Sequence, residues 1–131
     1  MIFVDTSALF ALASDRDQRH REARVSFDRL LRARRRLLTH SYVLSESMAL
    51  LHQRLGRRAA IAFAAEVRNA FEVEWVGESL HNAAVDALRS APGGVSRVDQ
   101  VSFLVMRERG IDEAFAFDTS FIAAGFRLYS A

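Results

Sequence analysis

Apolar residues along the chain fall into two patterns, short continuous runs and longer stretches in which they recur every three or four positions. Short apolar runs are typical of strands that are buried on both faces. They predict five strands, the last of them the weakest, at residues 1–5, 36–40, 72–76, 114–117 and 126–129.

The longer stretches predict helices. In the first of them, Ala23, Phe27 and Leu30 have the spacing of residues on one face of a helix. We expect helices at residues 17–34, 41–55, 57–70, around 80–88 and at 97–109, with short ones after the first and fourth strands. Gly56 and Gly110 stand where two of these helices should stop, because glycine readily adopts the backbone conformation of a helix C-terminus.

The alternation of strands and helices predicts a parallel sheet that is covered by helices on both faces. At 131 residues the chain is long enough to bury a core of its own. Its one Pro/Gly-rich stretch, at 91–94, is too short to be a linker between domains. We therefore expect residues 1–131 to form a single α/β domain of three layers.

Composition narrows the class of protein. No run approaches the roughly 20 apolar residues of a membrane span, and Asp5 interrupts the N-terminal run, unlike a signal peptide. The absence of cysteine excludes disulfides and thiolate metal sites and favours the cytoplasm. All 18 basic residues are arginine. This composition either suits contacts with phosphate groups or reflects the codon usage of a GC-rich genome. The net charge of +2 does not by itself indicate a nucleic-acid partner.

Four acidic residues stand at positions where a site is expected. Ligands of an open parallel sheet bind beyond the carboxyl ends of the strands, and Asp5 and Asp118 directly follow two predicted strands. Asp99 lies in the first turn of a predicted helix, and Glu46 lies inside another. Three of the four have a structural explanation, because each aspartate could cap a helix, Asp99 in a capping box with Ser96.

Glu46 has no such explanation, because it lies in mid-helix on the same stripe as Val43 and Leu50. We expect it to be buried, and a buried carboxylate without a partner costs on the order of several kcal/mol. The chain has no lysine to neutralise it. A divalent cation would hold all four acids ionised, since Mg²⁺ and Mn²⁺ prefer hard oxygen ligands. Thr6 and Ser7 could add hydroxyl groups to the same site, or cap the helix that begins there.

PIN-domain ribonucleases have four acidic motifs, and this chain resembles them at VDTSAL, SYVLSESMALL, SRVDQVSFLVMRERGI and AFAFDTSFIAAGF. The likeness is to the VapC-type toxins of toxin–antitoxin pairs, and it extends over essentially the whole chain. It implies a PIN-like α/β/α domain with a parallel sheet of order 3-2-1-4-5. It also implies four catalytic, metal-binding acids and two supporting hydroxyl groups, which correspond to Asp5, Glu46, Asp99, Asp118, Thr6 and Ser7.

The resemblance implies an endoribonuclease that depends on Mg²⁺ or Mn²⁺ and cleaves RNA through a metal-activated water. It further implies a frequent homodimer and a small VapB-like antitoxin as partner. Some relatives carry a further acid or polar group after the fourth acid, where this chain has Thr119 and Ser120, so a second metal ion would be held weakly or through the RNA phosphate.

Two alternatives from the same resemblance stay open. The chain could be a housekeeping RNA-processing nuclease, which its sequence does not distinguish from a toxin, or a PIN-like module that only binds a partner. A receiver-like aspartyl-phosphate domain built on Asp5 is disfavoured, because that chemistry normally needs a lysine near the phosphate.

Other candidate residues are less specific. Arg34, Arg35 and Arg36 form a basic cluster that is either a solvated helix end or a surface for RNA or an antitoxin. None of the four histidines has metal-ligand spacing, although His40, at the end of the second predicted strand, could reach the mouth of the site. Trp75 lies in a predicted strand and is expected to be a core residue.

Overall fold

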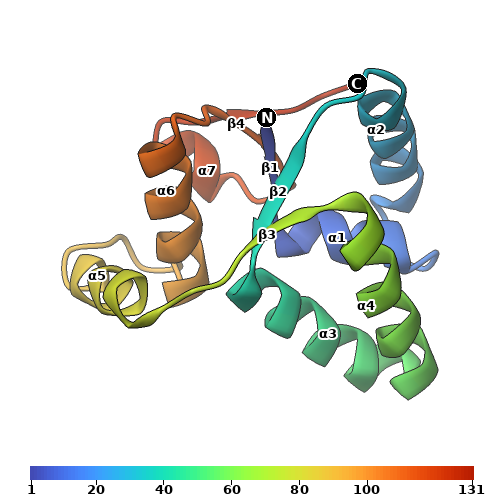
Figure 1. Ribbon diagram of the computed structural model, residues 1–131, viewed down its shortest axis with the longest axis horizontal. Coiled ribbons are helices and arrows are strands. Elements are labelled where there is room, and N and C mark those ends of the chain that lie inside the picture. Colours follow the sequence, from blue (N-terminus) through green and yellow to red (C-terminus); the bar gives the residue numbers. More distant parts are fainter.

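The computed structural model describes residues 1–131 as a five-stranded sheet with helices on both faces (Figure 1). The strands are β1 (Ile2–Val4), β2 (Leu37–His40), β3 (Glu72–Glu74), β4 (Glu113–Phe115) and β5 (Arg127–Leu128). The helices are α1 (Thr6–Ala13), α2 (His20–Arg32), α3 (Ser41–Leu55), α4 (Arg57–Ala70), α5 (Glu78–Leu88), α6 (Arg97–Arg109) and α7 (Ser120–Ala123). No helix is both long enough and apolar enough to span a membrane.

The sheet has the order β3-β2-β1-β4-β5, and each neighbouring pair is parallel. This confirms the predicted fold class and strand order. In the central strand, Phe3 is in register with Leu38 of β2 on one side and Ala114 of β4 on the other. The chain leaves β1 toward β2 and later returns to its other side as β4, so the topological switch point lies between β1 and β4. In α/β sheets of this kind, ligands bind at that point beyond the carboxyl ends of the strands.

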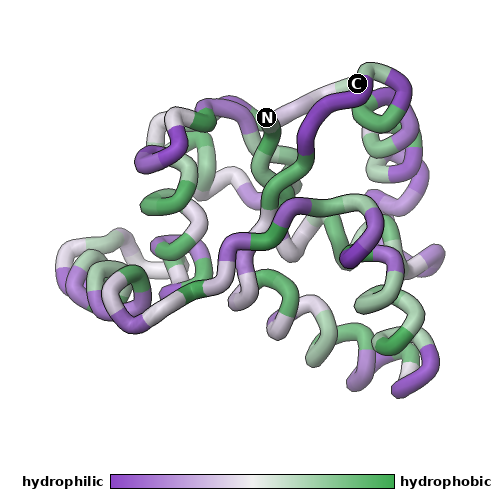
Figure 2. Tube along the Cα trace, viewed as in Figure 1, coloured by the Kyte–Doolittle hydropathy of each residue, from purple (hydrophilic) through white to green (hydrophobic).

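The central strands form the middle of the hydrophobic core. Every residue of β1 and β2 is buried, and Figure 2 shows β1 among the most apolar parts of the trace. Phe3 and Phe121 lie with ring centres 6.1 Å apart, and Phe103 of α6 meets Phe121 edge-on at 5.1 Å. Figure 1 shows α6 and α7 on one side of the strands and α2 and α4 on the other. The three-layer arrangement therefore fixes where the ends of β1 and β4 are presented.

Two glycines end helices at the predicted positions. Gly56 follows α3 with φ 96° and Gly110 follows α6 with φ 66°, backbone conformations that side chains with a Cβ atom adopt at a cost. As a result α3, α4 and α6 begin and end at the residues that their hydrophobic periodicity predicted.

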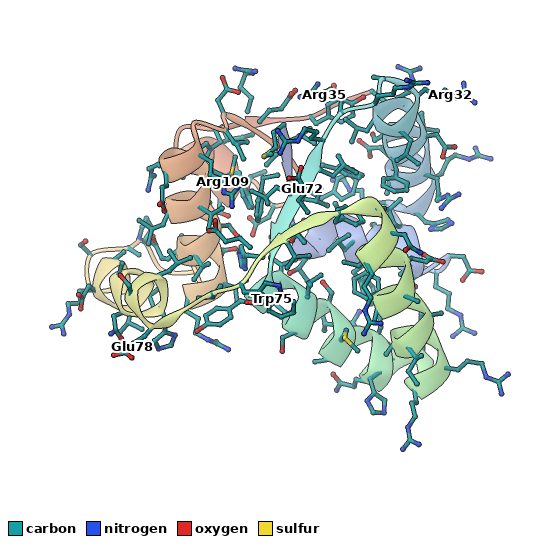
Figure 3. All side chains as sticks on the ribbon, viewed as in Figure 1. Arg32, Arg35, Glu72, Trp75, Glu78 and Arg109 are labelled. Atoms are coloured by element: carbon teal, nitrogen blue, oxygen red, sulfur yellow. The ribbon has the colours of Figure 1, made fainter.

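Trp75 corrects a prediction. It lies one residue beyond β3, which is an edge strand, and 75% of its surface is exposed. The expectation of a core residue was wrong because a strand at the edge of a sheet has fewer neighbours to cover it than a central one. Figure 3 shows the Trp75 side chain beside the start of α3.

Candidate active site

Asp5 directly follows β1 and is the N-cap residue of α1. Its Oδ2 atom accepts hydrogen bonds from the backbone N–H of Ser7 (3.3 Å) and from the Ser7 hydroxyl (2.8 Å). The Ser7 hydroxyl in turn accepts a hydrogen bond from the backbone N–H of Phe117 (2.9 Å), the residue before Asp118. Ser7 therefore ties the carboxylate after β1 to the segment after β4, and the predicted capping role of Asp5 is confirmed.

Asp99 and Asp118 also hold the beginnings of helices. Asp99 Oδ2 accepts the backbone N–H of Ser96 (3.0 Å), and the Ser96 hydroxyl accepts the N–H of Asp99 (3.1 Å), which is the predicted capping box of α6. Asp118 Oδ1 accepts the N–H of Ser120 (2.9 Å), the first residue of α7, but the N-cap residue of α7 is Thr119, so the prediction that Asp118 caps this helix was wrong. In Asp5, Asp99 and Asp118 one carboxylate oxygen makes these bonds and the other makes none. Capping a helix and presenting an oxygen to a ligand are therefore compatible.

The acids lie close enough together to affect one another's ionisation. The pKa of Asp5 is raised to about 6, mainly by burial and to a smaller extent by the negative charge of Asp99, against the hydrogen bonds from Ser7. Burial also raises the pKa of Asp99, against its capping hydrogen bonds, and the charges of Asp118 and Glu46 add to the rise. The fold thus brings Asp99 within electrostatic range of the other three acids, although they come from four separate segments of the chain.

Glu46 lies in the second turn of α3 and is half-buried, so the expectation of full burial was wrong. It lines a cavity of about 540 Å³ together with Tyr42, Gln53 and Arg97. Figure 1 shows that α3 extends past the ends of the strands. The part of α3 that carries Glu46 borders the cavity instead of the core. The Glu46 carboxylate is therefore accessible to solvent and to a substrate.

The donor set fits a hard divalent cation. None of the four acids forms an ion pair with an arginine. The hydroxyl oxygens of Thr6 and Ser120, which are adjacent to or near the acids in sequence, are buried without a hydrogen-bond partner. No three acidic or histidine side chains are gathered closely enough to hold a metal ion through direct bonds alone. This arrangement suits Mg²⁺, which is usually bound through one or two carboxylates and keeps several of its waters.

His40 makes a contribution that the sequence did not predict. It is fully buried, so the expectation that it could reach the mouth of the site was wrong. Its Nδ1 atom accepts the backbone N–H of Val43 (3.3 Å), and its Nε2 atom lies 2.8 Å from the Ser102 hydroxyl, which donates to the carbonyl of Val98 (3.0 Å). Because that hydroxyl donates onward, Nε2 must carry the ring proton. Burial lowers the pKa of His40 to about 3, so the ring is neutral.

This chain of hydrogen bonds joins the start of α3 to the first turn of α6. These helices carry Glu46 and Asp99, so His40 and Ser102 fix the relative position of two of the acids. The sequence signal for the contact was weak. It consisted of one polar residue, Ser102, among the apolar positions of a predicted helix, and its partner lies 62 residues away.

The basic cluster lies away from the acids. Arg34, Arg35 and Arg36 precede β2, whereas the acids follow parallel strands, so the cluster lies at the opposite end of the sheet (Figure 3). Arg36 makes two hydrogen bonds with Glu72, at 2.9 and 2.7 Å, and Arg35 pairs with Glu113 at 3.1 Å. Two of the three guanidinium groups are thus engaged with carboxylates of β3 and β4, and a role for this cluster in binding RNA stays a prediction.

Comparison with known proteins finds relatives that match nearly the whole chain. The chain is 43% identical over 129 residues to VapC20 of Mycobacterium tuberculosis, named a 23S rRNA-specific endonuclease, in two strains of that organism. The alignment covers 96% of this chain and 95% of the relative.

Solved structures show the same relationship. The crystal structure of M. tuberculosis VapC20, described as a sarcin–ricin loop cleaving toxin, has a TM-score of 0.89 and 39% identity, with full coverage of both chains. The Pyrobaculum aerophilum protein PAE2754 shares the fold, with a TM-score of 0.62 at 23% identity over 97% of this chain and 87% of that one. The PIN domain family model matches residues 2–127, and the chain therefore belongs to the PIN-domain family, among its VapC-type members.

Proposed function

We propose that this protein is an endoribonuclease that depends on Mg²⁺ or Mn²⁺ and acts as the toxin of a VapBC-type pair. The observation that supports the proposal is that Asp99 lies within electrostatic range of Asp5, Asp118 and Glu46, while none of the four acids forms an ion pair with an arginine. Four carboxylates in this arrangement would repel RNA unless a cation were bound among them. A relative with 43% identity that is named an endonuclease favours a catalytic protein over a module that only binds a partner.

In such a reaction, different residues of the chain would bind the metal ion and activate the water. A bound divalent ion would lower the pKa of a water molecule and offset the negative charge on the phosphate oxygens. Asp5, Asp99 and Asp118 would hold this ion, one or two of them directly and the rest through its bound waters, because each has a carboxylate oxygen that accepts no hydrogen bond. Glu46, half-buried at the cavity wall, would orient the attacking water and accept its proton. The products would be a 5′-phosphate and a 3′-hydroxyl.

The relative indicates a substrate. We propose that the chain cleaves ribosomal RNA at the sarcin–ricin loop, as the M. tuberculosis protein is described to do, and that it works in the cytoplasm where ribosomes are found. The description of that relative as a toxin also favours a toxin over a housekeeping RNA-processing enzyme.

The test is cleavage of a synthetic RNA hairpin that carries the sarcin–ricin loop. We expect cleavage with Mg²⁺ or Mn²⁺, none with EDTA, and product ends that bear a 5′-phosphate. Glu46→Gln should lower the rate by about 10²- to 10⁴-fold, the usual contribution of a proton-accepting side chain. Glu108→Gln, an exposed change at the far end of α6, is the matched control and should leave the rate unchanged. Cleavage that persists in EDTA, or a fully active Glu46→Gln protein, would refute the mechanism.

Two protein partners are part of the proposal. A small VapB-like antitoxin would silence the enzyme, and a second copy of the chain would form a homodimer. The exposed Trp75 stands over an apolar cavity of about 510 Å³ that is also lined by Leu44, Met48 and Val73, which is surface of the kind that protein partners cover. Sedimentation equilibrium of the purified chain measures the dimer directly, and purification together with the product of a small adjacent gene tests the antitoxin.

A further inference from the structure

A polar cleft of about 520 Å³ lies among the end of α1, the loop that follows it and the end of α3. Three arginines line it, Arg16, Arg19 and Arg54. We propose that this cleft binds the RNA backbone beside the scissile bond, so that its guanidinium groups hold the phosphates next to the one being cleaved. This inference rests on the proposed function and adds a second, basic part to the acidic site.

Two aromatic rings connect the cleft to the acids. The Arg19 guanidinium lies over the ring of Phe117, 5.2 Å from its centre, and Phe117 immediately precedes Asp118. The Arg54 guanidinium lies over Phe10 at the same distance. Phe10 is five residues after Asp5, or about 7 Å along the axis of α1 at 1.5 Å per residue. A stacked nucleic-acid strand rises about 3.4 Å per nucleotide, so the cleft begins roughly two nucleotides from Asp5.

The guanidinium groups are available for phosphate. A guanidinium stacked on an aromatic ring keeps the N–H groups at its edge free, and stacking reduces the entropy that it loses on binding. Arg16 and Arg54 make no ion pair. Arg19 pairs with Glu22 at 3.1 Å, but both side chains are more than half exposed, and such pairs are weak enough for phosphate to displace. The one carboxylate in the lining is that of Asp17, which accepts the backbone N–H of Arg19 (2.8 Å).

The lining favours RNA over a protein segment. Of the eight residues that line the cleft only Phe10 and Leu55 are hydrophobic, whereas a helix of a partner protein docks through an apolar groove. Proteins that bind single-stranded nucleic acid follow its backbone with a positively charged groove, and three arginines line this cleft. By contrast, Arg35 and Arg36 at the other end of the sheet are already paired with carboxylates.

The experiment measures binding without cleavage. An Asp5→Asn protein in EDTA is titrated onto a fluorescein-labelled single-stranded RNA of about 20 nucleotides, and anisotropy is recorded at several salt concentrations. Adding Arg54→Gln should weaken binding by about 10-fold, because a charged hydrogen bond to phosphate is lost. The slope of log K against log salt should fall by about 0.7 for each phosphate contact removed. Arg16→Gln changes an exposed side chain without a partner and should also weaken RNA binding. It tests the cleft independently in case the Arg54→Gln change in α3 disturbs folding.

The matched control is Arg32→Gln, which removes one exposed, unpaired guanidinium at the opposite end of the sheet (Figure 3). It should change binding by less than twofold. An equal loss in this control would overturn the proposal, since it would mean that RNA responds only to net charge. Unchanged RNA binding by the Arg54 variant would overturn it as well, and Arg54-dependent binding of a polyglutamate peptide would then identify a protein ligand.

Failure of the proposed function would look different. Arginine-dependent RNA binding by a protein whose wild type cleaves no RNA would refute the nuclease and leave the cleft as an RNA site. A wild type that cleaves RNA, with binding indifferent to both cleft arginines, would refute the cleft alone.

Discussion

Replacement of Asp5 by asparagine should stabilise the metal-free protein. The pKa of Asp5 is about 6 in the folded protein against 3.8 for an ordinary aspartate, mainly because the carboxylate is buried. Between these two values the folded state binds more protons than the unfolded state, so this group lowers the free energy of unfolding as the pH rises from about 4 to 6. A difference of about two pKa units corresponds to a cost of about 3 kcal/mol at pH 7.

Asparagine removes the charge and keeps much of the local structure. Its side-chain oxygen can still accept the bonds from Ser7, and asparagine is as good an N-cap residue as aspartate. We therefore expect a gain of about 1–3 kcal/mol at pH 7, or a rise in Tm of roughly 3–10 °C for a domain of this size. At pH 4 the gain should fall below about 1 kcal/mol, because Asp5 of the wild type then carries a proton in the folded state.

Thermal melting followed by circular dichroism in EDTA measures both values. Asp28→Asn, an exposed change on α2, is the control and should shift Tm by less than about 2 °C at either pH. Added Mg²⁺ should raise the Tm of the wild type more than that of the variant, because binding to the folded state stabilises it. A fall in Tm for Asp5→Asn at pH 7, or a gain of the same size at pH 4, would refute the argument from buried charge.

Three further predictions concern other parts of the fold. Ser102→Ala should lower the free energy of unfolding by about 1–3 kcal/mol, because it leaves the Nε2–H of a buried histidine unpaired. Urea titration measures this loss, with Ser90→Ala as an exposed control. An equal loss of stability in the two variants would argue against a role for the hydrogen bond with His40. His40 is neutral in the folded protein, with a pKa of about 3 against 6.5, so its contribution to stability is complete above pH 6.5 and is lost as the pH falls toward 3. That loss amounts to about 3 kcal/mol at pH 4, and urea titration from pH 7 to pH 4 should show a shallower decline for His40→Asn than for the wild type. Trp75→Ser should change monomer stability by less than about 0.5 kcal/mol while shifting sedimentation equilibrium toward monomer, and an unchanged dimer would place the interface elsewhere.

Much of the fold follows from local pattern. The helices at 41–55, 57–70 and 97–109 have regular apolar stripes and glycine stops, so their bounds could be read from the chain. The strand order could not be derived from periodicity, because a local sequence pattern does not determine which strands are neighbours in the sheet. It came from resemblance to a family. The wrong prediction for Trp75 has the same origin, since its burial depended on whether its strand lay at the centre or at the edge of the sheet.

The candidate site was partly predictable for the same reason. Asp5 and Asp118 could be placed because parallel strands bring their carboxyl ends to one edge of the sheet. The half-exposure of Glu46 depends on how far α3 extends beyond that edge, which is a property of packing and not of its own sequence. The contact between His40 and Ser102 joins helices far apart in the chain, and no spacing rule could have indicated it.

The helix-capping bonds of Asp5 and Asp99 bear on how relatives of this protein should be judged. A descendant that lost its enzymatic role would still need capping side chains at positions 5 and 99 to begin α1 and α6, so an aspartate retained there is poor proof of catalysis. Glu46 supports no helix terminus, and nothing in folding would preserve it once chemistry ceased. Under the proposed mechanism, position 46 is therefore the diagnostic one, and its replacement should mark members that have become inactive.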